Sequence, residues 1–180
     1  MKKILFSMLT LASMVIFLNA CKDDEKVDNG TLTIDGTKFS LKKGYTFSGD
    51  EVVEGEDTYY GWTLILASEG VSVGDDGLTG EGDLIFLEMY ALNIEGDELP
   101  AGTYHYPGDD DLHLILYGEI LLGFDVESEE GDIVDLDNVE TAEAVITKSG
   151  SRYTVKITIK RPGEADIVVN YTGTITVLED

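Results

Sequence analysis

Residues 153–160, which read YTVKITIK, carry the pattern that decides the fold of this chain. Tyrosine, valine and isoleucine side chains occupy every second position, and threonine and lysine fill the positions between them. In an extended strand, side chains alternate between the two faces, so a period of two places the apolar set on one side. β-Branched and aromatic residues also favour strands. The stretch therefore predicts a strand with one face in a hydrophobic core.

Strands are predicted on both sides of this stretch. Ser149-Gly150 is a turn signal, and a two-residue loop there sets Ile146 opposite Tyr153. Pro162-Gly163 turns the chain again. In the last predicted strand the apolar residues occupy alternate positions and therefore share one face. They are Ile167, Val169, Tyr171, Ile175 and Val177. We therefore expect a C-terminal antiparallel sheet with one shared apolar face.

A hairpin is predicted near residue 31. Thr31–Ile34 and Thr37–Leu41 flank Asp35-Gly36, a pair that suits a type I′ turn because both central residues need positive φ. This loop sets Leu32 opposite Phe39. The apolar side chains of both strands then point to the same side, as a core requires.

The middle of the chain differs, because some of its predicted strands carry apolar side chains on both faces. Predicted strands are Thr58–Ala67, Asp83–Leu92, Ala101–Tyr106 and Leu112–Phe124, separated by clusters of glycine and aspartate at 74–77, 80–83, 107–111 and 127–132. Between 84 and 92, the odd positions are all apolar (Ile85, Leu87, Met89 and Ala91), and the even positions are apolar or aromatic apart from Glu88. Three explanations remain open: a covering loop, a ligand cavity of the lipocalin type, or a surface for a partner.

These signals predict an all-β fold for a single domain over residues 31–180. About nine or ten short strands favour an antiparallel β-sandwich, with a closed lipocalin-like β-barrel as the alternative. The segment Leu99-Pro100-Ala101-Gly102-Thr103-Tyr104, with the hairpins up to residue 177, resembles small β-domains of unknown function in Bacteroidetes lipoproteins. That resemblance implies a fold class and no activity.

The N-terminus predicts export. Met1-Lys2-Lys3 precedes an uncharged, mostly apolar run to Leu18, shorter than the about 20 residues of a membrane span, which is typical of a signal peptide over residues 1–20. Leu18-Asn19-Ala20-Cys21 resembles the lipobox of bacterial lipoproteins, which implies cleavage before Cys21 and lipid on its thiol. Lys22-Asp23-Asp24-Glu25 resembles the surface-export signal of Bacteroidetes lipoproteins. We therefore expect an outer-membrane lipoprotein exposed at the cell surface, with residues 21–30 as a flexible acidic tether.

Composition excludes several classes of function. Asp and Glu number 36 against 12 Lys and Arg, a formal net charge of −24, which repels phosphates and argues against nucleic acid partners and against membrane binding through charge. Cys21 is the only cysteine, so the domain has no disulfide and no thiolate site. The membrane contact would come from the lipid on Cys21.

No enzyme signature is present, and we expect no cofactor. The chain lacks a nucleophile elbow, an H-E-x-x-H motif, a P-loop and a dinucleotide fingerprint. If 107–111 is a hairpin loop, His105 and His113 become cross-strand neighbours on a polar face below Asp109, Asp110 and Asp111. Two imidazoles and a carboxylate can bind a divalent metal, although a solvated polar pair is the favoured interpretation.

Acidic loops and aromatic residues provide the remaining candidates. The acidic run 127–137 invites a calcium interpretation, but it lacks the spacing of an EF-hand, and solvation is favoured. In the predicted strand 58–67, Trp62 lies on the same face as the predicted core residues, whereas Tyr59 lies on the opposite face. A ligand or partner face is predicted at Tyr59, Phe86, Tyr90 and Tyr117.

The function predicted from these observations is a lipid-anchored, surface-exposed, non-catalytic binding module for a glycan or a protein. Its support is the predicted anchor, the acidic composition and the double-sided strands. Two alternatives remain: a glycan hydrolase with a pair of Asp or Glu residues, and a barrel that carries a small apolar ligand.

Overall fold

The computed structural model describes residues 29–74, 77–107, 113–135 and 138–178. Within these residues there are thirteen β-strands and no α-helix. The strands are β1 (Asn29–Ile34), β2 (Thr37–Leu41), β3 (Lys43–Glu54), β4 (Asp57–Ala67), β5 (Val71–Gly74), β6 (Gly77–Leu92), β7 (Gly102–Tyr106), β8 (His113–Asp125), β9 (Glu130–Asp135), β10 (Thr141–Ser149), β11 (Arg152–Lys160), β12 (Ile167–Thr174) and β13 (Thr176–Val177). The predicted all-β class is confirmed.

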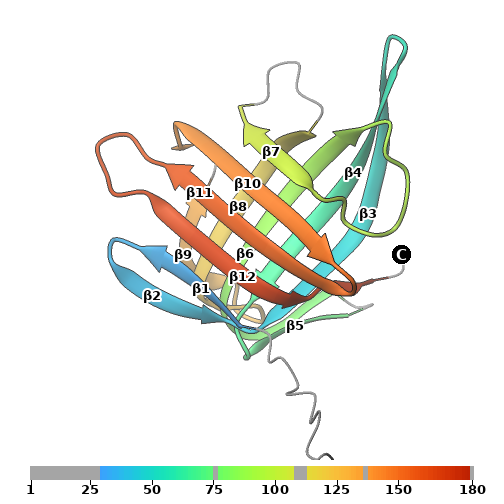
Figure 1. Ribbon diagram of the computed structural model, residues 1–180. Helices are drawn as coiled ribbons and strands as arrows, with labels where there is room; N and C mark the ends of the chain where they lie inside the picture. Colours follow the sequence, from blue (N-terminus) through green and yellow to red (C-terminus); the bar gives the residue numbers. More distant parts are fainter. Residues whose placement is uncertain (1–28, 75–76, 108–112, 136–137, 179–180) are drawn as a thin grey trace, which may run out of the picture.

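The strands form one curled sheet (Figure 1). Its order is β13-β3-β4-β6-β8-β7-β10-β11-β12-β1-β2, and β5 and β9 branch from β6 and β8. After β12 the chain passes through Ile175 into β13, which pairs in parallel with β3 at the far end of that order. Because β12, the third strand from one end of this order, continues directly into β13 at the other end, the sheet bends around a concave side. A sandwich of nine or ten strands is not confirmed.

The main core lies on this concave side. Inward residues of β11 are buried, with Ile157 fully buried and Tyr153 only 4% exposed. The alternation in 153–160 is thus confirmed as a division between core and solvent. The hydroxyl of Tyr104 donates to the carbonyl oxygen of Pro100 at 3.0 Å, and that of Tyr171 donates to the carbonyl oxygen of Thr174 at 2.7 Å. The polar ends of these buried rings are therefore satisfied.

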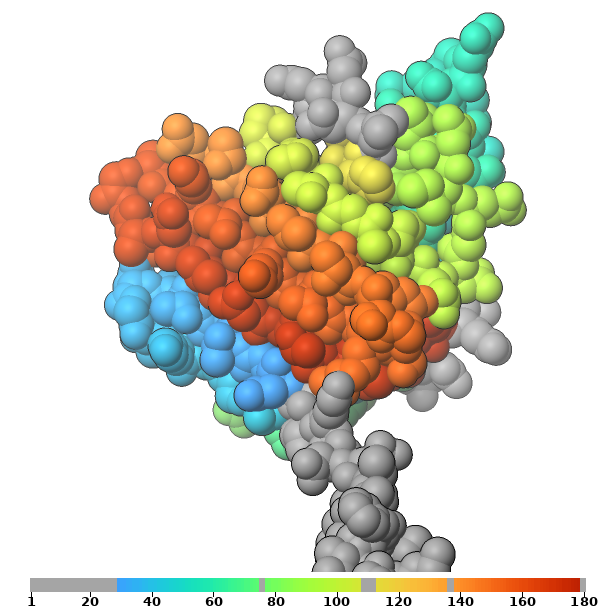
Figure 2. Space-filling model, in the orientation of Figure 1, coloured from blue at the N-terminus to red at the C-terminus, as the bar shows by residue number. Residues whose placement is uncertain are grey.

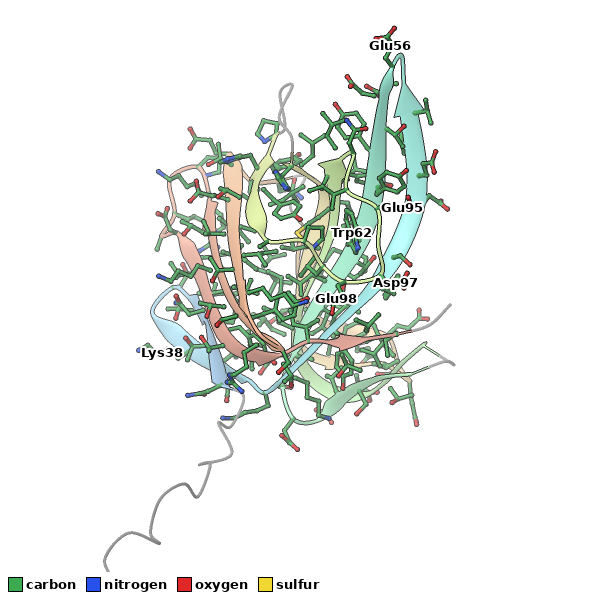
Figure 3. All side chains as sticks on the ribbon, turned by 45° about the vertical axis from the view of Figure 1, so that its right-hand side comes forward. Lys38, Glu56, Trp62, Glu95, Asp97 and Glu98 are labelled. Atoms are coloured by element: carbon green, nitrogen blue, oxygen red, sulfur yellow. The ribbon has the colours of Figure 1, made fainter. Side chains whose placement is uncertain are left out.

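The segment between β6 and β7 packs over this core from one end. Leu99 is buried in the core cluster, and the indole nitrogen of Trp62 donates to the carbonyl oxygen of Gly96 at 3.1 Å. Figure 3 shows Trp62 pointing toward this segment, which carries Glu95, Asp97 and Glu98. The predicted core position of Trp62 is confirmed, since its exposed fraction is 1%.

The N-terminal hairpin has the predicted register. Leu32 lies opposite Phe39 and Ile34 opposite Thr37. Asp35 and Gly36 have φ values of 50° and 80°, as a type I′ turn requires. Strand β1 begins at Asn29, so the predicted tether ends earlier than residue 30. The predicted signal peptide, Cys21 and the rest of the predicted tether lie outside the described residues.

Two C-terminal predictions need correction. Ser149 pairs with Arg152, so the turn is Gly150-Ser151, and Ile146 lies opposite Val155 instead of Tyr153. Gly150 has a φ of +60°, which fits the first central position of the turn. The register error is two residues, and it therefore leaves every side chain on its predicted face. Val177 is 39% exposed, because beyond Ile175 the chain leaves the β12 ladder for β3.

Sequence reasoning did not predict β3, β5 or β9 as strands. Two glycine and aspartate clusters expected as loops belong at least in part to strands, since 80–83 lies within β6 and Glu130–Asp132 begin β9. At Gly80 the carbonyl oxygen of Gly70 stands 2.2 Å from where a β-carbon would be, and φ is +92°. Glycine here permits close backbone contact within a strand. Among the described residues, none forms a helix with the length and apolar character needed to cross a bilayer.

The division of β11 into a buried and an exposed face can be tested by a pair of substitutions. Ile157→Ala leaves a cavity in the core and is expected to lower the free energy of unfolding by about 2–5 kcal/mol. Lys156→Ala, on the outward face, is expected to change it by less than about 0.5 kcal/mol. Urea unfolding followed by the fluorescence of Trp62, the only tryptophan, measures both. Equal losses in the two variants would contradict the assigned faces.

Candidate functional site

The convex side of the sheet carries a second apolar layer. Ile65, Ala67, Val71, Leu84 and Leu121 form a buried cluster separate from the main core. Along β6, Ile85 and Leu87 point into the main core, whereas Leu84 points into this outer cluster. The prediction that 83–92 is apolar on both faces is confirmed. Of the three explanations, a covering segment accounts for this part of the outer face, because Val71 of β5 is fully buried in the cluster.

Lys43 fastens the covering segment to β3. Its ammonium group donates to the carbonyl oxygens of Glu69 at 2.8 Å and Val71 at 2.9 Å, and to the hydroxyl of Ser72 at 3.0 Å. These bonds use all three donors of the ammonium group. Strand β5 is thereby held over the lower part of the outer face.

Beyond the reach of β5, the outer face continues as an aromatic–carboxylate patch. We define this patch as Phe86, Glu88 and Tyr90 of β6 with Tyr117 and Glu119 of β8. Phe86 pairs in register with Glu119, and Glu88 pairs with Tyr117. Rings and carboxylates therefore alternate along both strands and across them.

The geometry of the patch is set by contacts among its own members. The rings of Phe86 and Tyr117 have centroids 6.1 Å apart and are inclined at 66°, an edge-to-face arrangement. The hydroxyl of Tyr117 donates to the carboxylate of Glu119, and that of Tyr90 donates to the carboxylate of Glu88 at 3.3 Å. Burial, followed by the charge and hydrogen bond of Glu88, raises the pKa of Tyr90 above its ordinary value. Both hydroxyls thus act as donors to neighbouring carboxylates.

The patch differs in exposure from one end to the other. Tyr90 is only 9% exposed, because its ring lies against Gly61, where an added β-carbon would come within 3.2 Å of the ring. Phe86, Glu88, Tyr117 and Glu119 are half-buried. Leu116, at a register shift of β8, is 58% exposed, and Ile133 on neighbouring β9 is 55% exposed. The apolar outer face thus reaches solvent at Leu116 beside Tyr117 and, farther along, at Ile133 opposite Leu121.

All four residues of the predicted ligand face lie on this side of the sheet. Phe86, Tyr90 and Tyr117 are brought together, whereas Tyr59 lies farther along β4, opposite Leu92. Tyr90 offers little surface for a ligand. Glu88 and Glu119 were not predicted, although Glu88 interrupts an apolar parity and Glu119 follows Tyr117 by one strand period.

The predicted histidine pair does not form. Strands β7 and β8 pair in parallel, with His105 in register with Leu114, so the expected antiparallel hairpin is wrong. The ring of His113 packs against buried Tyr104 at 4.8 Å, whereas the imidazole of His105 lies 3.9 Å from exposed Glu143. The two imidazoles therefore point to opposite sides. Asp109, Asp110 and Asp111 lie outside the described residues, within which no group of three potential metal ligands gathers.

A polar groove is the second candidate site. It has a volume of about 520 Å³ and lies along the outer surface of β7, β10 and β11, the last two of which cross the front of the molecule in Figure 2. Its charged lining residues are His105, Glu143 and Lys160. Glycoside hydrolysis ordinarily needs two carboxylates, and the lining contains one. Among the described residues, the groove therefore brings together no pair of carboxylates of the kind that the hydrolase alternative requires.

The half-buried position of His113, whose Nε2 atom is inaccessible to solvent, predicts a pH dependence of stability. Desolvation lowers its pKa below the ordinary 6.5 in the folded state, so the unfolded state binds the proton more readily. Stability is therefore expected to fall as pH drops below 6.5. His113→Phe keeps the ring contact with Tyr104 and should lose that part of the dependence, whereas His105→Phe should retain it. Urea unfolding of the three proteins between pH 7.5 and about 5 measures the difference, and an unchanged slope in His113→Phe would refute the assignment.

Known proteins do not assign a role to either candidate site. No protein-family model, curated protein or solved structure matches the chain. The function is therefore inferred from the placement of the side chains.

Proposed function

We propose that the protein is a lipid-anchored, non-catalytic binding module on the outer face of the outer membrane, and that its partner contacts the aromatic–carboxylate patch. The observation that carries the binding function is the uncovered part of the outer apolar face. Leu116, which precedes Tyr117 on β8, is 58% exposed, and Ile133, opposite Leu121 on β9, is 55% exposed. Exposed apolar surface next to aromatic rings is typical of a surface that a partner covers.

The proposed anchor agrees with the direction in which the chain leaves the domain. The described chain begins at Asn29, at the end of the molecule opposite to the tip of the β3–β4 hairpin (Figure 1). Glu56 marks that tip in Figure 3. Lipid on Cys21 and a short tether would hold the Asn29 end toward the membrane and turn the hairpin away from it.

The two alternative functions receive less support. Side chains from β1, β4, β6, β8, β10, β11 and β12 pack in one cluster on the concave side, so a small apolar ligand would have to displace them. The carrier alternative is therefore disfavoured. The hydrolase alternative has no favoured position, since the described groove brings a single carboxylate.

The anchor is tested by changing Cys21. Cys21→Ser removes the thiol that would receive the lipid and should move the protein from the membrane fraction to the soluble fraction, with loss of labelling by an alkyne fatty acid. Lys26→Ser, in the same predicted tether, should leave both unchanged. Protease treatment of intact cells then tests surface display, which predicts degradation of the wild-type protein. Membrane association of Cys21→Ser equal to wild type would disprove the anchor.

Binding at the patch is tested by a matched pair of exposed apolar residues. Leu116→Ser combined with Tyr117→Ala removes one ring of the patch and the exposed apolar side chain beside it. The double variant should weaken binding of the best ligand from a screen of glycans and surface proteins by about tenfold or more. Val53→Ser, on the β3–β4 hairpin, removes a side chain that is 62% exposed and should change affinity by less than about twofold. A ligand that binds both variants like wild type does not use the patch.

A further inference from the structure

The aromatic–carboxylate patch has an unusual balance of hydrogen-bonding groups. Its carboxylates, Glu88 and Glu119, accept from the hydroxyls of Tyr90 and Tyr117. Those two hydroxyls are thereby used as donors. What remains available to a partner is a set of acceptor oxygens beside aromatic rings, with no basic side chain among the patch residues.

Among the residues that the structure describes, no cationic side chain forms an ion pair with either carboxylate. The ion pairs of the described residues involve Glu143, Glu98, Asp35 and Glu164, and neither Glu88 nor Glu119 is in an ion pair. Lys43 is directed to the β5 backbone instead. The two carboxylates of the patch are therefore not paired with a described cation, within a chain whose formal net charge is −24.

A sugar matches this surface poorly. A sugar hydroxyl both donates and accepts, and its ring stacks on a flat aromatic platform. The rings of Phe86 and Tyr117 are inclined at 66° and form no common plane. A guanidinium group matches better, because it has five N–H donors, no acceptor, a positive charge and a planar face that packs on aromatic rings.

We propose that the patch docks a polypeptide segment that presents arginine side chains, with lysine as a weaker substitute. Guanidinium groups would pair with the carboxylates of Glu88 and Glu119 and lie against the rings of Phe86 and Tyr117. Leu116 next to Tyr117, and Ile133 farther along the outer face opposite Leu121, extend the exposed apolar surface beyond the reach of a single side chain, which favours a polypeptide over a small cation. This inference rests on the proposed binding function and adds the chemistry of the partner.

The test uses tetraarginine and tetralysine as probes at about 150 mM salt, where the screening length is about 8 Å and long-range attraction is weak. Full-length protein with Cys21→Ser is titrated by calorimetry. Glu88→Gln with Glu119→Gln should raise the Kd of tetraarginine at least about tenfold. Glu127→Gln with Glu129→Gln removes the same charge from exposed positions and should raise it less than about twofold. Circular dichroism confirms that each variant keeps its strands.

A second pair of variants tests the rings. Phe86→Leu with Tyr117→Leu keeps apolar bulk without a π-face, so the preference for tetraarginine over tetralysine should fall toward equality. Tyr117→Phe keeps the ring and should keep most of the preference. Amide shifts in NMR spectra on addition of tetraarginine should centre on β6 and β8.

Two results would overturn the proposal. Equal weakening by the two carboxylate pairs would mean that tetraarginine senses only overall charge. The second result combines two observations: Leu116→Ser with Tyr117→Ala weakens the binding of a neutral glycan or protein, and no change in the patch alters the Kd of tetraarginine. That result would refute a cationic partner and would leave the proposed binding function standing. If changes in the patch weaken neither tetraarginine nor any ligand from the screen, both the cationic partner and the binding function of the patch are refuted.

Discussion

The structure depends on the need to keep water from both faces of β4, β6 and β8. A strand with one apolar face is satisfied by a single core, as β11 is. Each of these three strands has two apolar faces, and therefore each face of the sheet needs its own apolar layer to exclude water. On the concave side the main core forms this layer. On the convex side β5 covers part of the surface, and hydrogen bonds from Lys43 keep β5 in place. The uncovered remainder is the surface that a partner would complete.

The same requirement explains the course of the sheet. Curling brings β13 beside β3, so that inward residues of distant segments share one cluster and few strand edges stay open. The segment over Trp62 adds Leu99 to that cluster. With the concave side filled in this way, polar and charged groups available for recognition lie on the outside, in the patch and in the groove at His105.

Much of the fold could be predicted from local pattern. The alternation in 153–160 and the Asp35-Gly36 turn are complete signals, because they depend only on neighbouring residues. The parallel pairing of β7 and β8 could not be predicted, since parallel neighbours ordinarily need a connection of about a dozen residues or more. Their described overlap is a single register pair at His105 and Leu114, which a short connection permits. Strand β5 escaped prediction because it ends in the cluster 74–77 and lies near the cluster 80–83, both of which predict loops, whereas Gly80 serves close packing against the backbone of Gly70.

The candidate site was predictable in part. Parity alone places Phe86 and Tyr90 on one face, but only the register between β6 and β8 sets Glu119 beside Phe86 and Glu88 beside Tyr117. Register across a long connection is not encoded in either strand by itself. Likewise, the ring of Tyr90 is buried because Gly61, on the neighbouring strand β4, has no side chain to displace it.

The account is tested most directly by thiol labelling of single cysteines placed along β6 in a Cys21→Ser background, which has no other thiol. It predicts slow labelling at positions 85 and 87 in the main core, slow labelling at position 84 beneath β5, and fast labelling at positions 86 and 88 in the patch. Equal rates at 85 and 86, or fast labelling at 84 together with 86 and 88, would contradict a two-faced strand whose outer side β5 covers only in part.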